Sequence, residues 1–308
     1  MKGITCISIS LLIAVPSINA QQEDFPELTG PYLGQTPPGN EQELFAPGIV
    51  STTAGNHSSV AISPDGKELI WSMTEKLWFT KLQNGAWSKP QMLPFGKGDS
   101  YWYDNPFITP DGKTLFFTSY PPGSVSKEKE TIWSAKRTPF GWSDPEPISA
   151  AVNTVPLHWS ISVSDSGTLF FQFQDVTGES DGGIGDIYYS RLVDGAYTKP
   201  VAMGAEINTR YIETCPYIAP DESYLIFNRF YETRENSGIY VSYRDESGNW
   251  LPAVFAYGGS VGKGGISPRV SPDGQYMFFA NGSEGMWWVS AGFIEALRPG
   301  ESRSLIVD

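Results

Sequence analysis

A four-residue turn motif recurs five times along the chain, and this repetition limits the folds that the chain can adopt. Each copy follows a short apolar run and precedes a longer run rich in aromatic residues. The copies are Ser63-Pro64-Asp65-Gly66, Thr109-Pro110-Asp111-Gly112, Ser164-Asp165-Ser166-Gly167, Ala219-Pro220-Asp221-Glu222 and Ser271-Pro272-Asp273-Gly274. Their second residues lie 46, 55, 55 and 52 positions apart. A period near fifty residues with strand–turn–strand content predicts a β-propeller with one blade per repeat.

Further patterns divide each repeat into four strands, A to D. Strand A ends at the turn, where Pro fixes φ, Asp bonds its own backbone and Gly accepts positive φ. Strand B is the aromatic run that follows, as in Leu115-Phe116-Phe117, and strand C carries a second such run, as in Ile132-Trp133-Ser134. An aromatic–hydroxyl–proline pattern such as Trp87-Ser88-Lys89-Pro90 introduces strand D. Because proline cannot donate to a sheet ladder, strand D is predicted to be the outer edge.

The pattern before strand D occurs four times, and the segment Leu44 to Pro47 lies where a fifth strand D is needed. We therefore predict an all-β, five-bladed propeller in which this N-terminal strand completes the last blade and removes both open edges. Six blades is the alternative, and it requires residues 24–53 to form more than one strand. Trp78, Trp133 and Trp287 are predicted to pack between blades. Asn153 and Asn208, which recur at matching places, are expected to fix loops through side-chain-to-backbone bonds.

The first twenty residues have the composition of a signal peptide. Lys2 precedes the apolar run Ile4 to Val15, and Ala20 is a small residue at the expected cleavage point. A membrane anchor is the alternative, and the apolar run is short for it. We expect residues 1–20 to be removed on export to the periplasm or the extracellular space. Residues 21–43 are then an N-terminal extended segment and residues 44–308 the propeller.

The charge and cysteine content restrict the partners that the protein can bind and the bonds that can stabilise it. The formal net charge is −13, which argues against broad binding to nucleic acid or to an anionic membrane surface. No segment after the leader is long and apolar enough to span a membrane. Cys215 is the one cysteine outside the leader, so no intrachain disulfide is expected. We expect a monomer whose stability comes from burial.

The repeat as written at Ser63 to Leu69, Ser-Pro-Asp-Gly-Lys-x-Leu followed by aromatic residues, resembles the propeller repeat of TolB-type periplasmic proteins, a distant WD40-like family. The resemblance extends from about Leu44 to Ser290. It implies the fold but no single activity, because the family includes non-catalytic binding propellers, propeller domains attached to peptidases, and enzymes similar to oligogalacturonate lyases. The repeats occupy nearly the whole chain, so the peptidase branch is not expected.

A candidate metal site comes from one position of the repeat. The residues six places before each turn are His57, Tyr103, His158, Glu213 and Gly265, and both histidines of the chain are among them. Strand A is the innermost strand, so these side chains are expected to converge on the mouth of the central channel. Imidazole and carboxylate groups suit a divalent metal such as zinc, with His57, His158 and Glu213 as ligands. The alternative is that these residues line or cap the channel without a metal.

A candidate ligand site lies on the same end of the ring. The B–C and D–A connections, which are longer than the A–B turns, emerge there, and we call this end the loop-rich face; the opposite end is the turn face. Long loops on a rigid scaffold often carry binding. Aromatic faces with a few charged groups suit a sugar or another small polar ligand. The residues predicted to bind it are Tyr101, Tyr103, Asp104, Trp159, Arg210 and Arg269.

Two functions follow from these residues. The first, which we favour, is an exported propeller that binds a ligand or a partner protein through the loop-rich face. The second, implied by the resemblance to oligogalacturonate lyases, is a metal-assisted lyase or hydrolase of an acidic oligosaccharide. In that enzyme Tyr103 or Asp104 is the candidate proton carrier. Arg210 or Arg269 pairs with the substrate carboxylate or, without metal, with Glu213.

Overall fold

The five turn motifs form tight β-turns that join the two inner strands of each blade. In blade 1 the Gly66 N–H donates to the Ser63 carbonyl at 2.8 Å, and the equivalent bond recurs in the other four copies at 2.8–3.0 Å. Asp65 accepts the Lys67 N–H at 3.1 Å, which fixes the turn from inside. The fourth residue has a positive φ in every copy, 68° at Gly66 and 60° at Glu222. The motif therefore sets the position of each hairpin.

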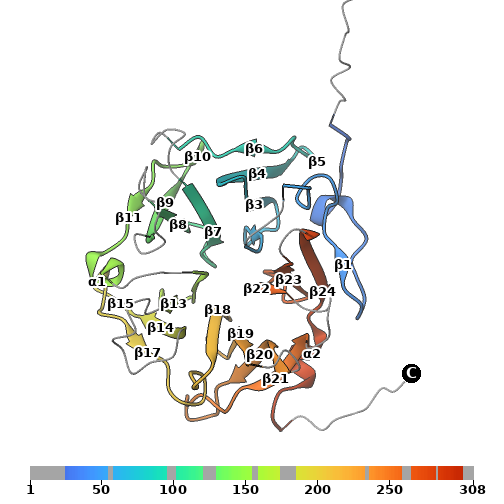
Figure 1. Cartoon of the computed structure of the whole chain (residues 1–308). Coiled ribbons are helices and arrows are strands. Elements are labelled where there is room, and N and C mark those ends of the chain that lie inside the picture. Colours follow the sequence, from blue (N-terminus) through green and yellow to red (C-terminus); the bar gives the residue numbers. More distant parts are fainter. Residues whose placement is uncertain are drawn as a thin grey trace, which may run out of the picture.

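The computed structural model describes residues 25–54, 58–95, 102–120, 130–154, 159–173, 185–232, 236–258, 265–281 and 284–300. Within them, antiparallel sheets are arranged as five blades around a central axis (Figure 1). Blade 1 contains β2 (Ala61–Ile62), β3 (Glu68–Met73), β4 (Lys76–Gln83), β5 (Ala86–Trp87) and β6 (Gln91–Met92). Blade 2 contains β7 (Trp102–Ile108), β8 (Thr114–Tyr120), β9 (Thr131–Thr138), β10 (Gly141–Trp142) and β11 (Glu146–Pro147).

The remaining blades follow the same order from the axis outward. Blade 3 contains β12 (Ile161–Val163), β13 (Leu169–Phe173), β14 (Asp186–Ser190), β15 (Leu192–Val193), β16 (Ala196–Tyr197) and β17 (Val201–Ala202). Blade 4 contains β18 (Ile212–Ile218), β19 (Tyr224–Phe230), β20 (Gly238–Tyr243) and β21 (Val254–Gly258). Blade 5 contains β22 (Ile266–Val270), β23 (Tyr276–Ala280), β24 (Met286–Ser290) and β1 (Glu43–Leu44). The short helices are η1 (Tyr32–Gly34), α1 (Ala150–Asn153) and α2 (Gly292–Ala296).

The N-terminal strand closes the ring, as the sequence predicts. Strand β1 pairs with β24 in the register Glu43 to Trp288 and Leu44 to Trp287. The next residue, Phe45, is fully buried and packs its ring 5.0 Å from Phe278 and 5.1 Å from Trp288. The last blade therefore takes its outer strand from the start of the propeller, and five blades, rather than six, complete the ring.

The aromatic–hydroxyl–proline pattern forms a hairpin before strand D. In blade 1, β5 pairs with the end of β4, and β6 then pairs with the part of β4 nearer its start. Pro90 lies between the two strands. The Ser88 hydroxyl accepts the Lys81 N–H at 3.1 Å, and Ser143 and Thr198 accept the equivalent bonds in blades 2 and 3 at 3.0 and 3.1 Å. The pattern thus produces the step from the hairpin to the outer edge.

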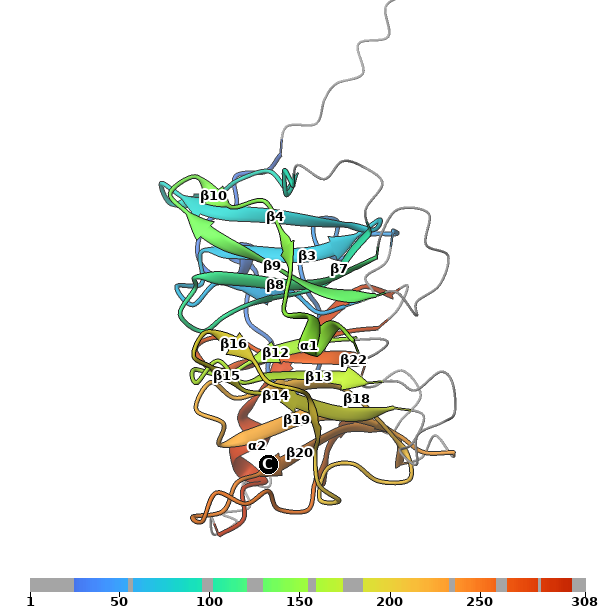
Figure 2. The same cartoon turned by 90° about the vertical axis from the view of Figure 1, so that its left-hand side faces the viewer.

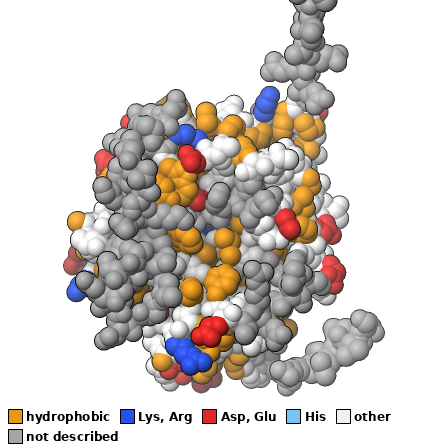
Figure 3. All heavy atoms as spheres, in the orientation of Figure 1, with side chains coloured by type: hydrophobic (Ala, Val, Ile, Leu, Met, Phe, Trp, Pro, Cys, Tyr) orange, Lys and Arg blue, Asp and Glu red, His pale blue; other side chains and the backbone are white. Residues whose placement is uncertain are grey.

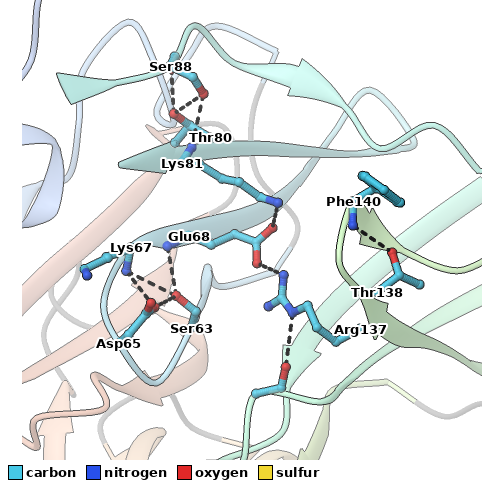
Figure 4. Close-up of polar contacts among 11 residues, drawn as sticks. Ser63, Asp65, Lys67, Glu68, Thr80, Lys81, Ser88, Arg137, Thr138 and Phe140 are labelled. Carbon is cyan, nitrogen blue, oxygen red and sulfur yellow. Dashed lines mark hydrogen bonds and ion pairs between the residues drawn. The ribbon is translucent and has the colours of Figure 1, made fainter. Parts of the chain in front are cut away.

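Two carboxylates join neighbouring blades on the turn face. Glu68, which is 4% exposed, contacts Lys81 of its own blade at 3.3 Å and Arg137 of blade 2 at 2.5 Å (Figure 4). Between blades 3 and 4, Glu222 accepts from Ser164 and pairs with Arg244 at 2.7 Å. This carboxylate occupies the turn position where the other four copies have Gly. These contacts join blade 1 to blade 2 and blade 3 to blade 4.

Two asparagines tie the D–A connections to strand C, as expected. The Asn153 amide exchanges two hydrogen bonds with the backbone of Ile132, at 2.8 and 3.0 Å. Asn208 makes the same pair of bonds with Ile187, at 2.9 and 3.0 Å.

In the part of the chain that the structure describes, no helix has the length and apolar character needed to cross a membrane.

The two ends of the ring differ in their connections. Every internal gap between the described ranges falls between strands B and C or between strands D and A. The A–B turns and the C–D hairpins are described throughout and lie at the opposite end (Figure 2). Figure 1 views the molecule along its axis from the loop-rich face.

Candidate functional site

The middle of the central channel is filled by a polar cluster. Four residues, each four places before a turn, have φ between 49° and 58°: Asn105, Ser160, Cys215 and Ser267. The Ser160 hydroxyl lies 3.0 Å from that of Ser267 and donates to the side-chain Oδ1 atom of Asn105 at 3.4 Å. The Ser267 hydroxyl contacts the Cys215 sulfur at 3.4 Å. These bonds join strand A of four blades, so side chains close the channel between its two ends.

Residues one place nearer the loop-rich face extend the cluster to the preceding blade. Asp104 is 4% exposed and accepts hydrogen bonds from Ser58 at 2.8 Å and from Ser72 at 2.5 Å. In blade 4 the Thr214 hydroxyl donates to Gln172 of blade 3. Because Asp104 already accepts bonds from two hydroxyl groups and lies in a buried site, its role in the structure is to join blades 1 and 2.

Glu213 is completely buried and forms an ion pair with Arg229, whose Nε lies 2.6 Å from its carboxylate. Thr209 donates to both carboxylate oxygens, through its hydroxyl at 2.7 Å and its N–H at 3.0 Å. Arg229 also donates to the Ile207 carbonyl at 2.7 Å. The partner of Glu213 is therefore Arg229, rather than Arg210 or Arg269 as expected, because Arg229 is its cross-strand neighbour on β19.

A second carboxylate lies next to this pair. Asp186 begins β14 and is 7% exposed, and its Oδ1 atom has no hydrogen-bond partner. Burial and the negative charge of Glu213 raise the pKa of Asp186 from 3.8 to about 6. The boundary between blades 3 and 4 therefore holds two carboxylates and one guanidinium just inside the loop-rich face.

Aromatic pairs lie nearer the loop-rich face, where strand A begins and strand B ends. Trp102 and Tyr120 of blade 2 stack with ring centres 4.1 Å apart and planes 8° apart. Tyr211 and Tyr231 form a similar contact in blade 4, with ring centres 4.2 Å apart. All four side chains are partly exposed. Figure 3 shows this face, with hydrophobic side chains around its centre and charged ones nearer its rim.

The residues predicted to bind a ligand are divided between different places. Trp159 is partly exposed at the start of strand A in blade 3. The Arg210 guanidinium is exposed and donates to the Tyr211 hydroxyl at 2.7 Å. Tyr103 is 4% exposed and packs edge-on against Phe117, so its ring belongs to the core. Tyr101 lies outside the described residues.

The metal prediction is only partly covered by the structure. His57 and His158 lie outside the described residues, and within those residues no group of three or more His, Cys, Asp or Glu side chains could hold a metal ion. Gly265 is the residue six places before the turn in blade 5, and a Cβ there would lie 2.2 Å from the Ala280 carbonyl oxygen. No side chain fits there. The divalent metal at His57, His158 and Glu213 therefore stays a prediction.

Arg269 lies on the turn face rather than the loop-rich face. It lines a pocket of about 270 Å³ at that end of the channel, together with Tyr217 and Phe107. The pocket lies on the axis because strand A of each blade contributes to its wall. The polar cluster separates this pocket from the aromatic pairs at the other end.

Sequence patterns that could have revealed these features were present but weak. Tyr120 and Tyr231, which the sequence analysis did not assign to the site, both follow the aromatic run of strand B. The small or polar residue four places before each turn, from Ser59 to Ser267, also recurs in all five repeats. Neither pattern indicates a function by itself, because the contacts between these side chains depend on how the strands pair.

Comparison with known proteins finds propellers at low sequence identity. No protein-family model matches the chain, and no curated protein sequence matches it. Among solved structures, a putative TolB from Agrobacterium tumefaciens is 19% identical over 72% of this chain and 68% of that one, with a TM-score of 0.49. TolB from Acinetobacter baumannii is 15% identical over 75% of this chain and 53% of that one, with a TM-score of 0.44.

A gluconolactonase from Xanthomonas campestris is 11% identical over 86% of this chain and 97% of that one, with a TM-score of 0.45. The chain spans about half the length of the Acinetobacter protein. The class of protein is defined by the chain's own topology, which is that of a five-bladed β-propeller.

Proposed function

We propose that this protein is an exported, monomeric binding propeller that holds a carbohydrate or another polar ligand on its loop-rich face. The observation that carries the proposal is the presence of two partly exposed aromatic contacts on one face, Trp102 with Tyr120 in blade 2 and Tyr211 with Tyr231 in blade 4. Aromatic faces provide apolar contact for the C–H side of a sugar, while adjacent charged groups bind its hydroxyl or carboxyl groups.

The groups beneath the aromatic pairs support a binding role over catalysis. Every oxygen of Glu213 has a partner, so a ligand does not need to satisfy it. Asp186 retains an unpartnered oxygen, and Arg210 is exposed beside Tyr211. A rigid buried ion pair under a partly exposed aromatic surface holds the surface in one arrangement, which reduces the entropy lost on binding. The metal-assisted lyase remains the alternative that metal analysis would test.

The proposal is tested by calorimetric titration with a panel of neutral and uronic-acid oligosaccharides. For any oligosaccharide that binds, Tyr231→Ala is expected to weaken binding by about tenfold, equal to about 1.4 kcal/mol, because one stacking face is lost. The matched control is Phe140→Ala. Phe140 is 99% exposed at the tip of the hairpin between β9 and β10, on the turn face.

Phe140→Ala is expected to leave the affinity unchanged. Weaker binding in Phe140→Ala together with normal binding in Tyr231→Ala would place the ligand on the turn face and refute the proposal. Circular dichroism of both variants checks that the fold is intact.

A further inference from the structure

The turn face holds a buried arginine that has no acidic partner. Arg269 is 5% exposed, and its guanidinium makes one hydrogen bond, from Nη1 to the Pro216 carbonyl at 3.1 Å. Its Nε has no hydrogen-bond partner. The Phe107 ring lies 5.2 Å from the guanidinium carbon. Arg229 is the one other buried arginine in the described residues, and it forms an ion pair with Glu213.

This charge is an exception within the repeat. The residue two places before the turn is Ala61, Phe107, Ser162 or Tyr217 in blades 1 to 4, and Arg269 in blade 5. One cation therefore takes a repeat position that holds a neutral residue in the other four blades. A buried charge without a partner costs several kcal/mol, so packing alone does not explain an arginine here.

The surroundings of Arg269 are apolar. The pocket of about 270 Å³ is walled by aliphatic and aromatic side chains and by the prolines of four turns, and Arg269 is its one charged lining residue. Hydroxyl groups come from Thr109 and Tyr217. Burial lowers the pKa of Arg269 from 12.5 to about 10, and the neighbours that act on it are Cys215 and Tyr217, neither of them a carboxylate. The guanidinium thus remains charged at neutral pH and faces a space that lacks a counter-ion.

We propose that this pocket binds a small organic acid, with its carboxylate on Arg269 and its apolar body against the channel wall. A guanidinium binds a carboxylate through two parallel hydrogen bonds, and its free Nε–H and remaining Nη atoms can supply them. The apolar wall selects acids with a hydrocarbon or aromatic body over inorganic anions. The pocket is separate from the loop-rich face, because the cluster of Asn105, Ser160, Cys215 and Ser267 lies between them.

The test is a titration of the full protein with benzoate and hexanoate, followed by calorimetry and thermal unfolding. Both acids are expected to raise the melting temperature in a dose-dependent manner, whereas benzamide and hexanamide, which lack the charge, are expected to give no shift. This comparison needs no variant. Equal shifts from acid and amide, or no shift from either acid, would overturn the proposal. Inorganic phosphate at the same ionic strength is expected to bind at least tenfold more weakly than benzoate, and equal binding would also overturn it.

The matched variants are Arg269→Met and Arg298→Met. Arg269→Met is expected to abolish the response to benzoate while the variant unfolds at the same or a higher temperature, because an unpaired buried charge has been removed. Arg298 lies on the turn face but pairs with Glu295, so Arg298→Met is expected to keep the response. A response that survives in Arg269→Met would exclude this site.

A peptide with an apolar C-terminus tests for a protein partner. If this peptide binds more tightly than its C-terminally amidated form and more tightly than benzoate and hexanoate, the pocket belongs to a protein partner and the small-molecule proposal is overturned.

Discussion

Asp186 and Glu213 are neighbouring buried carboxylates with opposite consequences for stability. Glu213 is neutralised by Arg229 and by two bonds from Thr209. Asp186 has no such partner at Oδ1, and burial together with the negative charge of Glu213 raises its pKa to about 6. The folded protein therefore binds a proton at Asp186 more tightly than the unfolded chain does. Stability from this group is fully present below pH 3.8 and is lost as the pH rises through about 6.

Asp186→Asn is expected to stabilise the protein at pH 7.5 by about 1–2 kcal/mol, because the amide carries no charge for burial and Glu213 to oppose. The gain is expected to shrink toward zero below about pH 4, where the wild-type carboxyl is protonated. Chemical denaturation at both pH values measures it. The contrasting variant is Glu213→Gln, expected to lose about 3–5 kcal/mol by leaving Arg229 unpaired. An Asp186→Asn protein less stable than wild type at pH 7.5 would contradict this account.

Strand β1 is the element on which the closed ring depends. It contributes two ladder pairs, but the residue after it, Phe45, is fully buried against Phe278 and Trp288. The segment before β1 adds further contacts. Trp87 donates its indole N–H to the Gly30 carbonyl at 2.7 Å, and the Tyr32 ring lies 5.4 Å from Trp288. Residues 21–43 are predicted as an extended segment, and the described residues before β1 pack along blades 1 and 5.

Phe45→Ala is expected to reduce the free energy of unfolding by about 3–5 kcal/mol, because it leaves a cavity where the last blade is closed. Deleting residues up to Pro47 is expected to cost more, since it also exposes the edge of β24. Thermal and chemical unfolding measure both. Phe140→Ala, at a fully exposed aromatic residue, serves as the neutral control. A truncated protein with the same melting temperature as the intact protein would show that ring closure does not stabilise the fold.

The strands were predictable from the sequence because their signals are local. Each turn is defined within four residues, and the spacing of the turns gives the number of blades. The candidate site depends on pairing between strands. In blade 4 the register of strand A shifts between Thr214 and Tyr217, where Cys215 has a φ of 55°. Because a bulge adds a residue, counting back from the turn no longer gives the side chains that face the axis. Cys215 reaches the axial cluster, whereas Glu213 meets Arg229.

At the scale of the whole molecule, the channel is divided into two ends with different chemistry. The loop-rich face presents partly exposed aromatic pairs over a buried ion pair, and the turn face presents an apolar pocket with one cation. The hydrogen-bonded cluster between them joins strand A of four blades. Ligands at the two ends are therefore expected to bind without competition, because they share no residue. The net charge of −13 should weaken the approach of acidic ligands from a distance, so that added salt assists their binding.

Hydrogen exchange in the presence of an oligosaccharide that binds is the most direct test of the central claim, that the loop-rich face is the binding surface. The account predicts added protection in the segments that carry the aromatic pairs, around Trp102, Tyr120, Tyr211 and Tyr231. It predicts unchanged exchange in the turns at Asp65, Asp111 and Asp273. Protection confined to those turns, with none at the aromatic pairs, would contradict the account.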